Sequence, residues 1–193
     1  MVRANPFSNG SPVTTKLTYE DYLKTSGDER YELLDGELFI LPAPSIAHQY
    51  VAMKLGTRFD TFVEDSNLGV VYSAPTDVVL SETDVVQPDL MFISSERANI
   101  VTSANILGAP DLIVEIRSDS TAKRDETIKR KMYAERGGKE YWLVNPEAKT
   151  ITVLLLGEGG YAEGATYTAG QTLASSMLEG FTVHLDEILL YRP

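Results

Sequence analysis

The chain has 193 residues, no cysteine, two histidines and a formal net charge of −11, with 43% hydrophobic residues. This length can bury a hydrophobic core, and the composition is typical of a globular protein. The lack of cysteine excludes disulfides and thiolate metal sites, and two histidines argue against a histidine-rich zinc site. We expect a cytoplasmic protein with no membrane segment, because the sequence shows neither a membrane-length apolar run nor a secretory signal pattern. The acidic balance argues against binding nucleic acid through a broadly basic surface.

The first third of the chain predicts an arm, a hairpin and a helix. Residues 1–16 are rich in Pro, Ser, Asn and Thr, which predicts a flexible N-terminal arm before a single domain over residues 17–193. A capping-box pattern at residues 18–21 predicts a short helix. Residues 30–34 and 37–41, joined by Asp35-Gly36, predict a hairpin, and residues 47–64 predict an amphipathic helix.

Two polar residues of these elements have open interpretations. Glu32 lies in the first strand of the hairpin, where a solvent-facing residue is the simpler interpretation and a ligand the alternative. His48 lies at the start of the helix, where a ligand or phosphate can bind, although a local hydrogen bond is the simpler interpretation.

The middle of the chain predicts strands and one strand–helix–strand unit. Residues 70–72, 76–80 and 85–93 predict strands, and Asp89 interrupts the apolar run of the third. Residues 112–116 predict a buried strand that contains one charge, Glu115. Helix formers over residues 125–136, then Gly137-Gly138 and the apolar residues 141–144, complete a right-handed βαβ unit.

The helix of this unit carries a polar stripe. Asp125, Lys129 and Tyr133 are spaced i, i+4 and i+8, so they lie on one helical face. An ordinary amphipathic helix with one ion pair explains this spacing. Glu115 favours a site instead, because a carboxylate in a strand core is costly unless it is paired or metal-bound, and a lysine on the next helix can reach it.

The last third of the chain predicts mainly strands. Residues 150–156 and 161–167 predict a hairpin across a glycine-rich turn, and residues 181–185 predict a last strand, with Asp186 as the cap of a terminal turn. These glycines match no phosphate-binding loop pattern. The basic residues concentrate in the 123–139 region, where Lys123, Arg124, Arg130 and Lys131 predict a basic stripe able to contact phosphates.

Asp89 and Glu115 are the acids that break two buried strands. If these strands are neighbours, the carboxylates converge at one edge of the sheet. Such a pair suits Mg²⁺, which prefers oxygen ligands and retains several waters. A bound metal lowers the pKa of its water and stabilises charge on a phosphoryl oxygen, and Lys129 can orient the water or offset that charge.

Pro88-Asp89 followed by Glu115-Ile116-Arg117 resembles the PD-(D/E)XK nuclease superfamily. More closely, the chain resembles a bacterial family of restriction endonuclease-like proteins. The matching segments are YELLDGEL (31–38), residues 44–48, QPDL (87–90), APDLIVEIRS (109–118), the Asp125/Lys129/Tyr133 face and EYWLVNP (140–146). The resemblance implies an α/β fold with a mixed β-sheet flanked by helices and additional β-hairpins.

The resemblance also implies an activity, Mg²⁺-dependent hydrolysis of DNA phosphodiester bonds, with Mn²⁺ as an alternative metal. Asp89, Glu115 and the carbonyl of Ile116 would bind the metal, and Glu32, His48 and Tyr133 would be accessory residues. Arg117 stands where the superfamily has its lysine. Arginine does not deprotonate, so the resemblance implies that Lys129 supplies the missing amine.

The rival interpretation is a catalytically silent relative, a homo-oligomeric binding or regulatory protein with the same fold. The net charge favours this rival, whereas the intact Asp89, Glu115 and Lys129 set favours the enzyme. A homodimer or higher homo-oligomer is expected in either case. The residues themselves favour neither DNA over RNA nor any recognition sequence.

Overall fold

The computed structural model describes residues 16–25, 29–118, 122–162 and 164–190. The predicted arm over residues 1–16 therefore lies outside the described residues, apart from Lys16. The helical elements are α1 (Tyr19–Tyr22), α2 (Ile46–Asp65), the 3-10 helix η1 (Ser95–Ile100), α3 (Ala122–Arg124), the π-helical segment η2 (Asp125–Lys129), α4 (Arg130–Glu135) and α5 (Asp186–Leu189). The strands are β1 (Arg30–Leu34), β2 (Glu37–Leu41), β3 (Gly69–Ser73), β4 (Val78–Ser81), β5 (Asp84–Val86), β6 (Leu90–Ser94), β7 (Ile106–Leu107), β8 (Leu112–Ile116), β9 (Glu140–Asn145), β10 (Thr150–Gly157), β11 (Gly160–Tyr161), β12 (Thr166–Thr168), β13 (Thr172–Ala174) and β14 (Thr182–His184).

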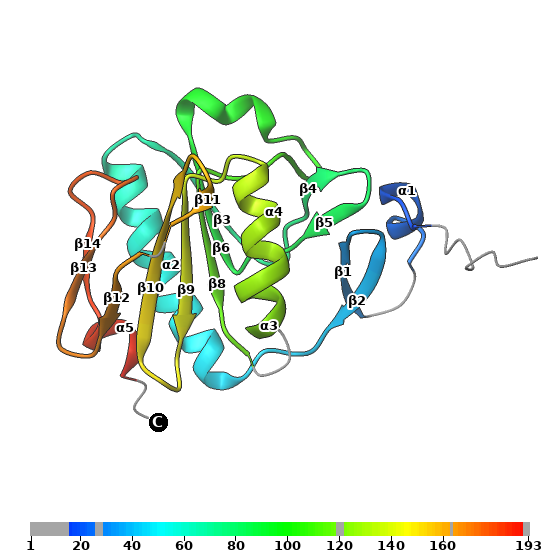
Figure 1. The fold of residues 1–193 in the computed structure, drawn as a ribbon. Helices are drawn as coiled ribbons and strands as arrows, with labels where there is room; N and C mark the ends of the chain where they lie inside the picture. Colours follow the sequence, from blue (N-terminus) through cyan, green and yellow to red (C-terminus); the bar gives the residue numbers. More distant parts are fainter. Residues whose placement is uncertain (1–15, 26–28, 119–121, 163, 191–193) are drawn as a thin grey trace, which may run out of the picture.

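The described strands form a large mixed sheet and two smaller sheets. The large sheet has the order β11-β10-β9-β8-β6-β3, with β12 also paired to β10, and only β8 and β9 in it run parallel. A second sheet, which we call the small sheet, has the order β2-β1-β5-β4-β7. It lies beside the large sheet, on the side away from β13 and β14 (Figure 1). The predicted mixed sheet with helices and added hairpins is thus confirmed.

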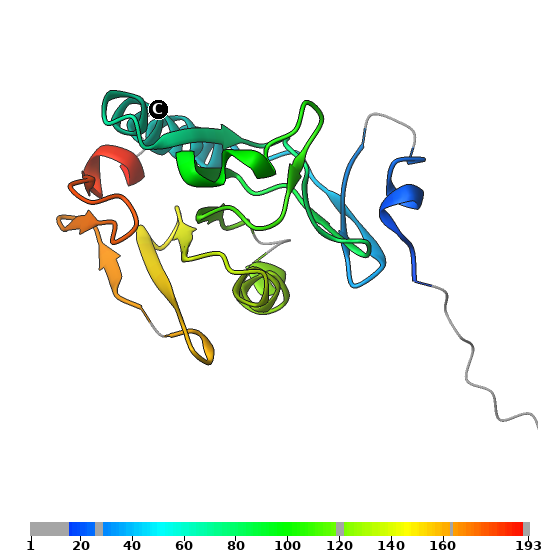
Figure 2. The same cartoon turned by 90° about the horizontal axis from the view of Figure 1, so that it is seen from above.

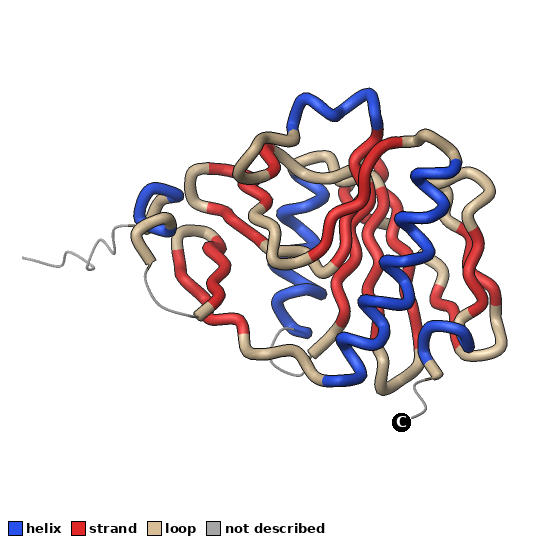
Figure 3. Tube along the Cα trace, turned by 180° about the vertical axis from the view of Figure 1, so that it is seen from behind, coloured by secondary structure: helices blue, strands red, loops and turns tan. Residues whose placement is uncertain are grey.

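Helices cover the large sheet on both faces. Helix α2 lies on one face and α4 on the other, as the view from above and the view from behind show (Figures 2 and 3). Side chains alternate along each strand, so Leu90 and Phe92 pack in the core with α2, whereas Met91 and Ile93 pack in the core with Tyr133 of α4. Within the described residues, no helix combines the length and apolar character that crossing a membrane requires.

The same alternation of side chains along the strand determines the face of the sheet from which Glu115 projects. Leu112, Val114 and Ile116 of β8 belong to the core beneath α2, so Ile113 and Glu115 project from the opposite face, toward the helical segments between β8 and β9. The parallel pairing of β8 with β9, with Leu112 opposite Glu140, confirms the predicted βαβ unit. Helical structure begins at Ala122, so the predicted helix formers over residues 125–136 fall within it up to Glu135, and it is π-helical over Asp125–Lys129. The turn and N-cap residues expected at 119–121 lie outside the described residues.

The predicted hairpin and the predicted long helix near the N-terminus are both present in the structure. Strands β1 and β2 pair across Asp35-Gly36, and both turn residues have positive φ, as a type I′ turn requires. Helix α2 begins one residue before, and ends one residue after, the predicted range of 47–64.

Three details differ from the sequence-based expectation. The predicted strand over residues 85–93 is two strands in different sheets, β5 and β6, because Pro88 has no N–H to continue a ladder and the chain crosses between sheets there. The sequence predicted neither β7, which pairs with β4, nor β13, which pairs with β14. Asp186 is the first residue of α5 rather than its cap, which is Leu185.

Candidate active site

Six of the seven predicted site side chains meet at the junction of the two main sheets. A cleft of about 640 Å³ opens there between β1, α2 and the ends of β6 and β8. Of the predicted residues, those that line it are Glu32, His48, Asp89, Glu115, Ile116 and Lys129. Tyr133 lies behind this wall and is fully buried, in contact with Glu115.

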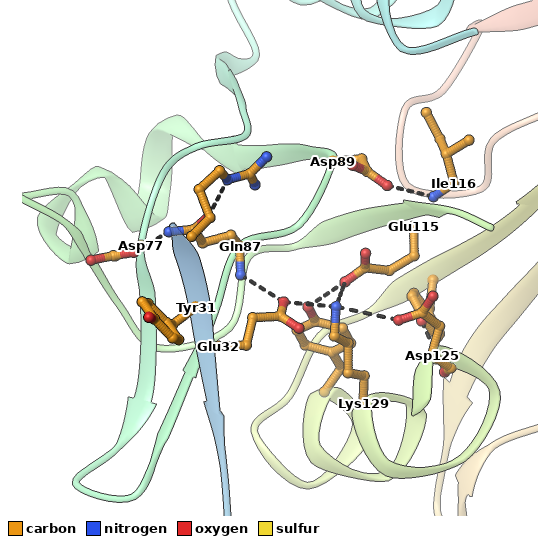
Figure 4. Close-up of polar contacts among 12 residues, drawn as sticks. Tyr31, Glu32, Asp77, Gln87, Asp89, Glu115, Ile116, Asp125 and Lys129 are labelled. Atoms are coloured by element: carbon orange, nitrogen blue, oxygen red, sulfur yellow. Dashed lines mark hydrogen bonds and ion pairs between the residues drawn. The ribbon is translucent and has the colours of Figure 1, made fainter. Parts of the chain in front are cut away.

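Lys129 is the centre of the site and is itself buried, with a side chain only 3% exposed. Its Nζ lies 2.7 Å from Oε1 of Glu32, 3.1 Å from Oε1 of Glu115 and 3.3 Å from Oδ1 of Asp125. We call Lys129 and these three carboxylates the buried charge cluster (Figure 4). It joins β1 of the small sheet, β8 of the large sheet and the π-helical segment, so a single lysine holds together elements far apart in sequence.

The cluster shows that the solvent-facing interpretation of Glu32 is wrong. Its side chain is fully buried, and its Oε1 accepts a second hydrogen bond, of 3.0 Å, from the backbone N–H of Gln87. Its Oε2 is buried and has no hydrogen-bond partner within the described residues. A buried carboxylate of this kind is stable only beside a cation, and Lys129 is that cation.

The environment fixes the charge of Lys129. Burial alone would lower the pKa of its amine, but Glu115, Glu32 and Asp125 outweigh burial and hold the pKa well above its usual range. Lys129 therefore stays protonated at neutral pH and cannot act as a general base. It can offset negative charge and orient its neighbours.

At Glu115, burial has the largest effect on the pKa and prevails over the neighbouring lysine. Burial raises the pKa of its carboxyl well above the usual range, Lys129 lowers it, and Asp125, Asp89 and Glu32 raise it again. Its Oε1 accepts hydrogen bonds from Nζ of Lys129 at 3.1 Å and from the hydroxyl of Tyr133 at 2.8 Å. Among the described residues nothing donates to Oε2, so Glu115 keeps one oxygen for a ligand.

Asp89 is held at the start of β6 next to Glu115. Its Oδ2 accepts a 2.7 Å hydrogen bond from the backbone N–H of Ile116 and lies 3.2 Å from Nε2 of His48. Since Leu90 pairs with Val114, Asp89 comes opposite Glu115 on the neighbouring strand. The two acids thus lie on neighbouring strands, as predicted. The backbone N–H of His48 donates a local hydrogen bond to Oγ of Ser45, and its side chain contacts Asp89.

The donors present fit a hard cation. No three His, Cys, Asp or Glu side chains form a ready metal cage in the described parts of the chain. Mg²⁺ does not require one, since it commonly uses one or two carboxylates together with waters. Oδ1 of Asp89 and Oε2 of Glu115 have no partner among the described residues. The β6–β8 register, continued by two residues, would also set Pro88 opposite Ile116, and proline has no N–H for the Ile116 carbonyl.

Within the described residues, Arg117 is the predicted site residue whose side chain neither lines this cleft nor pairs with a residue that does. Its Nη1 lies 3.3 Å from Oε1 of Glu126, and both side chains are about half exposed, at 45% and 50%. Residues 115 and 117 project from the same face of a strand, but β8 ends at Ile116. Arg117 lines a second cavity, of about 420 Å³, which Glu115 and Asp125 also line. The side chain thus pairs with a surface acid and does not enter the buried charge cluster.

We therefore expect Arg117→Ala to retain cleavage and to change the free energy of unfolding by no more than about 0.5 kcal/mol, the range of exposed ion pairs. Urea unfolding and a nuclease assay with Mg²⁺ measure both quantities. Loss of cleavage in a folded Arg117→Ala variant would show that this arginine acts at the site despite its position.

The predicted basic stripe is divided. The guanidinium of Arg124 stacks over the ring of Phe39, and Nη2 of Arg130 donates to the carbonyl of Tyr161, so these two side chains are engaged within the protein. Lys123 and Lys131 remain exposed. None of these four residues lines the cleft. The positive charge of the predicted stripe therefore lies outside the cleft, and this follows from tertiary packing that the composition does not specify.

Three residues of the site were not predicted as such. Asp125 was recognised only as part of the helical face, although it belongs to the cluster. Gln87 and Arg30 were not singled out, although both line the cleft. Their signal was spacing: Arg30 precedes Glu32 by two residues, and Gln87 precedes Asp89 by two, which places each pair on one face of extended backbone.

This fold is that of a nuclease-like α/β protein. The structure superposes with a TM-score of 0.76 on a protein from Anabaena variabilis described as "a putative nuclease belonging to DUF820", covering 90% of this chain and 97% of that one at 16% identity. The sequence model of the Uma2 family, described as "Putative restriction endonuclease", matches residues 18–186. The chain therefore belongs to the Uma2 family. It is also 24% identical over 139 residues to the "Uncharacterized protein slr1290" of Synechocystis sp., covering 70% of this chain and 72% of that protein.

Proposed function

We propose that this protein is a metal-dependent endonuclease that hydrolyses DNA phosphodiester bonds with Mg²⁺, or with Mn²⁺ in its place. The observation that carries the proposal is the convergence of Asp89, Glu115 and Lys129 on one cleft. Membership of a restriction endonuclease-like family supports the same reaction class.

In this proposal Asp89, Glu115 and the carbonyl of Ile116 hold the metal. When bound, Mg²⁺ would supply an acidic water and charge stabilisation at the phosphoryl oxygen. His48 and the Ile116 N–H hold Oδ2 of Asp89, which aims the other oxygen. Tyr133 and Lys129 hold Oε1 of Glu115 in the same way. Both carboxylates are thus oriented before a ligand arrives, as an efficient site requires.

Lys129 has an electrostatic role in this scheme. Because its amine stays charged, it offsets the negative charge that develops near the scissile phosphate rather than removing a proton from water. Arg117 has no part in the reaction. A homodimer or higher homo-oligomer stays a prediction.

The rival proposal is a catalytically silent relative that uses the same fold for binding or regulation. The net charge of −11 favours it, because a protein that relies on phosphate neutralisation normally has a basic face. The two proposals differ in what they expect from a metal titration.

Calorimetric titration of Mg²⁺ and Mn²⁺ should show one site in the wild type, with an affinity at least about tenfold lower in Asp89→Ala, because half of the carboxylate pair is lost. Plasmid cleavage should require the metal and be abolished in Asp89→Ala. Asp60→Ala, which removes an exposed acid from the cleft rim, is the matched control and should behave as wild type. Neither binding nor cleavage by a folded wild type would favour the silent relative.

A further inference from the structure

Arg30 occupies the wall of the cleft next to the buried charge cluster. It precedes Glu32 by two residues on β1, so both side chains project from the same face of that strand, roughly 7 Å apart along it. Glu32 reaches Lys129 at 2.7 Å, and Arg30 lines the cleft. The small sheet therefore presents one acid to the cluster and one guanidinium to the cleft in front of it.

A polar network fixes the base of this guanidinium. Nε of Arg30 donates a 2.9 Å hydrogen bond to Oε1 of Gln87. The amide nitrogen of Gln87 donates at 2.9 Å to Oδ1 of Asp77, which also accepts at 2.8 Å from the hydroxyl of Tyr22. Figure 4 shows Gln87 between Asp77 and Glu32. Since the backbone N–H of Gln87 binds Glu32, the same residue positions Arg30 and the cluster.

Arg30 is a cation in the wall of the cleft without an acidic partner among the described residues. Arg30 and Lys129 are the lysine and arginine side chains that line the described cleft, together with four acids, Glu32, Asp60, Asp89 and Glu115. Lys129 contacts three carboxylates and is 3% exposed. Arg30 forms no ion pair within the described residues, and Gln87, its neutral partner, engages only Nε. Its terminal nitrogens therefore remain to bind an anion.

We propose that Arg30 binds a backbone phosphate of the nucleic-acid strand whose bond is cut, adjacent to the metal ligands. The proposal rests on the proposed nuclease function and adds a substrate-binding residue to it. A guanidinium forms two parallel hydrogen bonds to non-bridging phosphate oxygens, and a fork held at Nε is already oriented for them. With the basic stripe diverted from the cleft, this contact supplies positive charge that an acidic protein otherwise lacks near its site.

The test compares binding with cleavage. Fluorescence anisotropy of a labelled DNA oligonucleotide is measured over a salt series with Ca²⁺ in place of Mg²⁺, and steady-state cleavage is measured with Mg²⁺. Arg30→Gln removes the charge but can keep a hydrogen bond to Gln87, and Arg30→Lys restores the charge without the fork. Arg58→Ala is the matched control, because Arg58 pairs with Glu187 at 2.6 Å and does not line the cleft.

Arg30→Gln should weaken binding and raise KM by about tenfold to a hundredfold, as loss of a charged hydrogen-bonding group does, with a smaller change in kcat. The slope of log K against log salt should fall by about 0.7–0.9, the equivalent of one phosphate. Arg30→Lys should restore the slope and only part of the affinity. Metal affinity, measured by calorimetry, should stay unchanged. If Arg30 only held the site together, its loss would be expected to disturb the metal ligands as well. If Arg30→Gln does not fold, Gln87→Met decides, with an expected loss of affinity at an unchanged slope.

Other outcomes separate the two proposals. If the wild type binds and cleaves while Arg30→Gln matches Arg58→Ala, the role of Arg30 is overturned and the nuclease function stands. If the wild type binds DNA without cleaving it, hydrolysis is overturned and the salt slopes still decide the role of Arg30. A folded wild type that neither binds nor cleaves overturns both.

Discussion

Lys129→Ala should abolish cleavage and lower the free energy of unfolding by about 3–5 kcal/mol at neutral pH, the cost of removing one partner from a buried ion pair. The amine contacts Glu32, Glu115 and Asp125, and its removal leaves three buried carboxylates without their cation. Because the pKa of Lys129 lies above its ordinary value of 10.5, its stabilising effect is complete below that pH. The effect is lost only as the pH rises through the higher folded-state pKa, so the full loss should be seen at pH 7.

Urea unfolding of both proteins measures this loss, with Lys131→Ala as control. Lys131 lies two residues further along the same chain segment, but it is exposed and 3.7 Å from Glu135, so its removal should have little effect. The loss in Lys129→Ala should shrink at low pH, where the stranded carboxylates take up protons. Metal binding should survive in the folded fraction, since Asp89 and Glu115 remain. Full activity in Lys129→Ala with complete loss in Arg117→Ala would reverse the roles assigned to these two residues.

Glu115→Gln should abolish cleavage and yet raise the free energy of unfolding of the metal-free protein at pH 8. The folded-state pKa of Glu115 is raised well above its ordinary value of 4.5, chiefly by burial, so ionisation of this group costs the folded state free energy. Glutamine keeps the shape and an acceptor for Tyr133 without the charge. Lys129 keeps two carboxylates, Glu32 and Asp125, in this variant.

The sign of the pH dependence makes this prediction specific. Below about pH 4.5 Glu115 is protonated in both states, so the variant and the wild type should be equally stable. The advantage of Glu115→Gln should grow as pH rises from there toward the folded-state pKa. Added Mg²⁺ should stabilise the wild type alone, because a ligand stabilises only the state that binds it. Glu126→Gln, an exposed acid, should show no such trend. A Glu115→Gln variant less stable than wild type at every pH would contradict the prediction.

The sequence by itself determined the secondary structure around the site and most of the site's members. Asp35-Gly36 specifies its hairpin, because the two turn residues need positive φ and these residue types tolerate it. The apolar run around Glu115, the helix after it and the run at residues 141–144 specify the βαβ unit, because parallel strands require a crossover. Glu115 can be recognised as a site residue from the sequence, because an unpaired charge in a buried strand costs too much free energy to be retained without a partner.

Only the tertiary structure decided how charge is distributed among these residues. Local patterns describe which face of a strand or helix a residue occupies, but not which other element packs against that face. The sequence therefore predicted Glu32 at the surface, whereas packing of the small sheet places it against Lys129. The sequence predicted Arg117 at the site, whereas β8 ends one residue before it. The chain passes from the small sheet to the large sheet at Pro88. Gln87, before the crossing, therefore contacts Arg30, and Asp89, after it, lies opposite Glu115. Coulombic and hydrogen-bonding contacts act over a few ångströms in space, whatever the separation in sequence, so the protonation of the cluster follows from the packing.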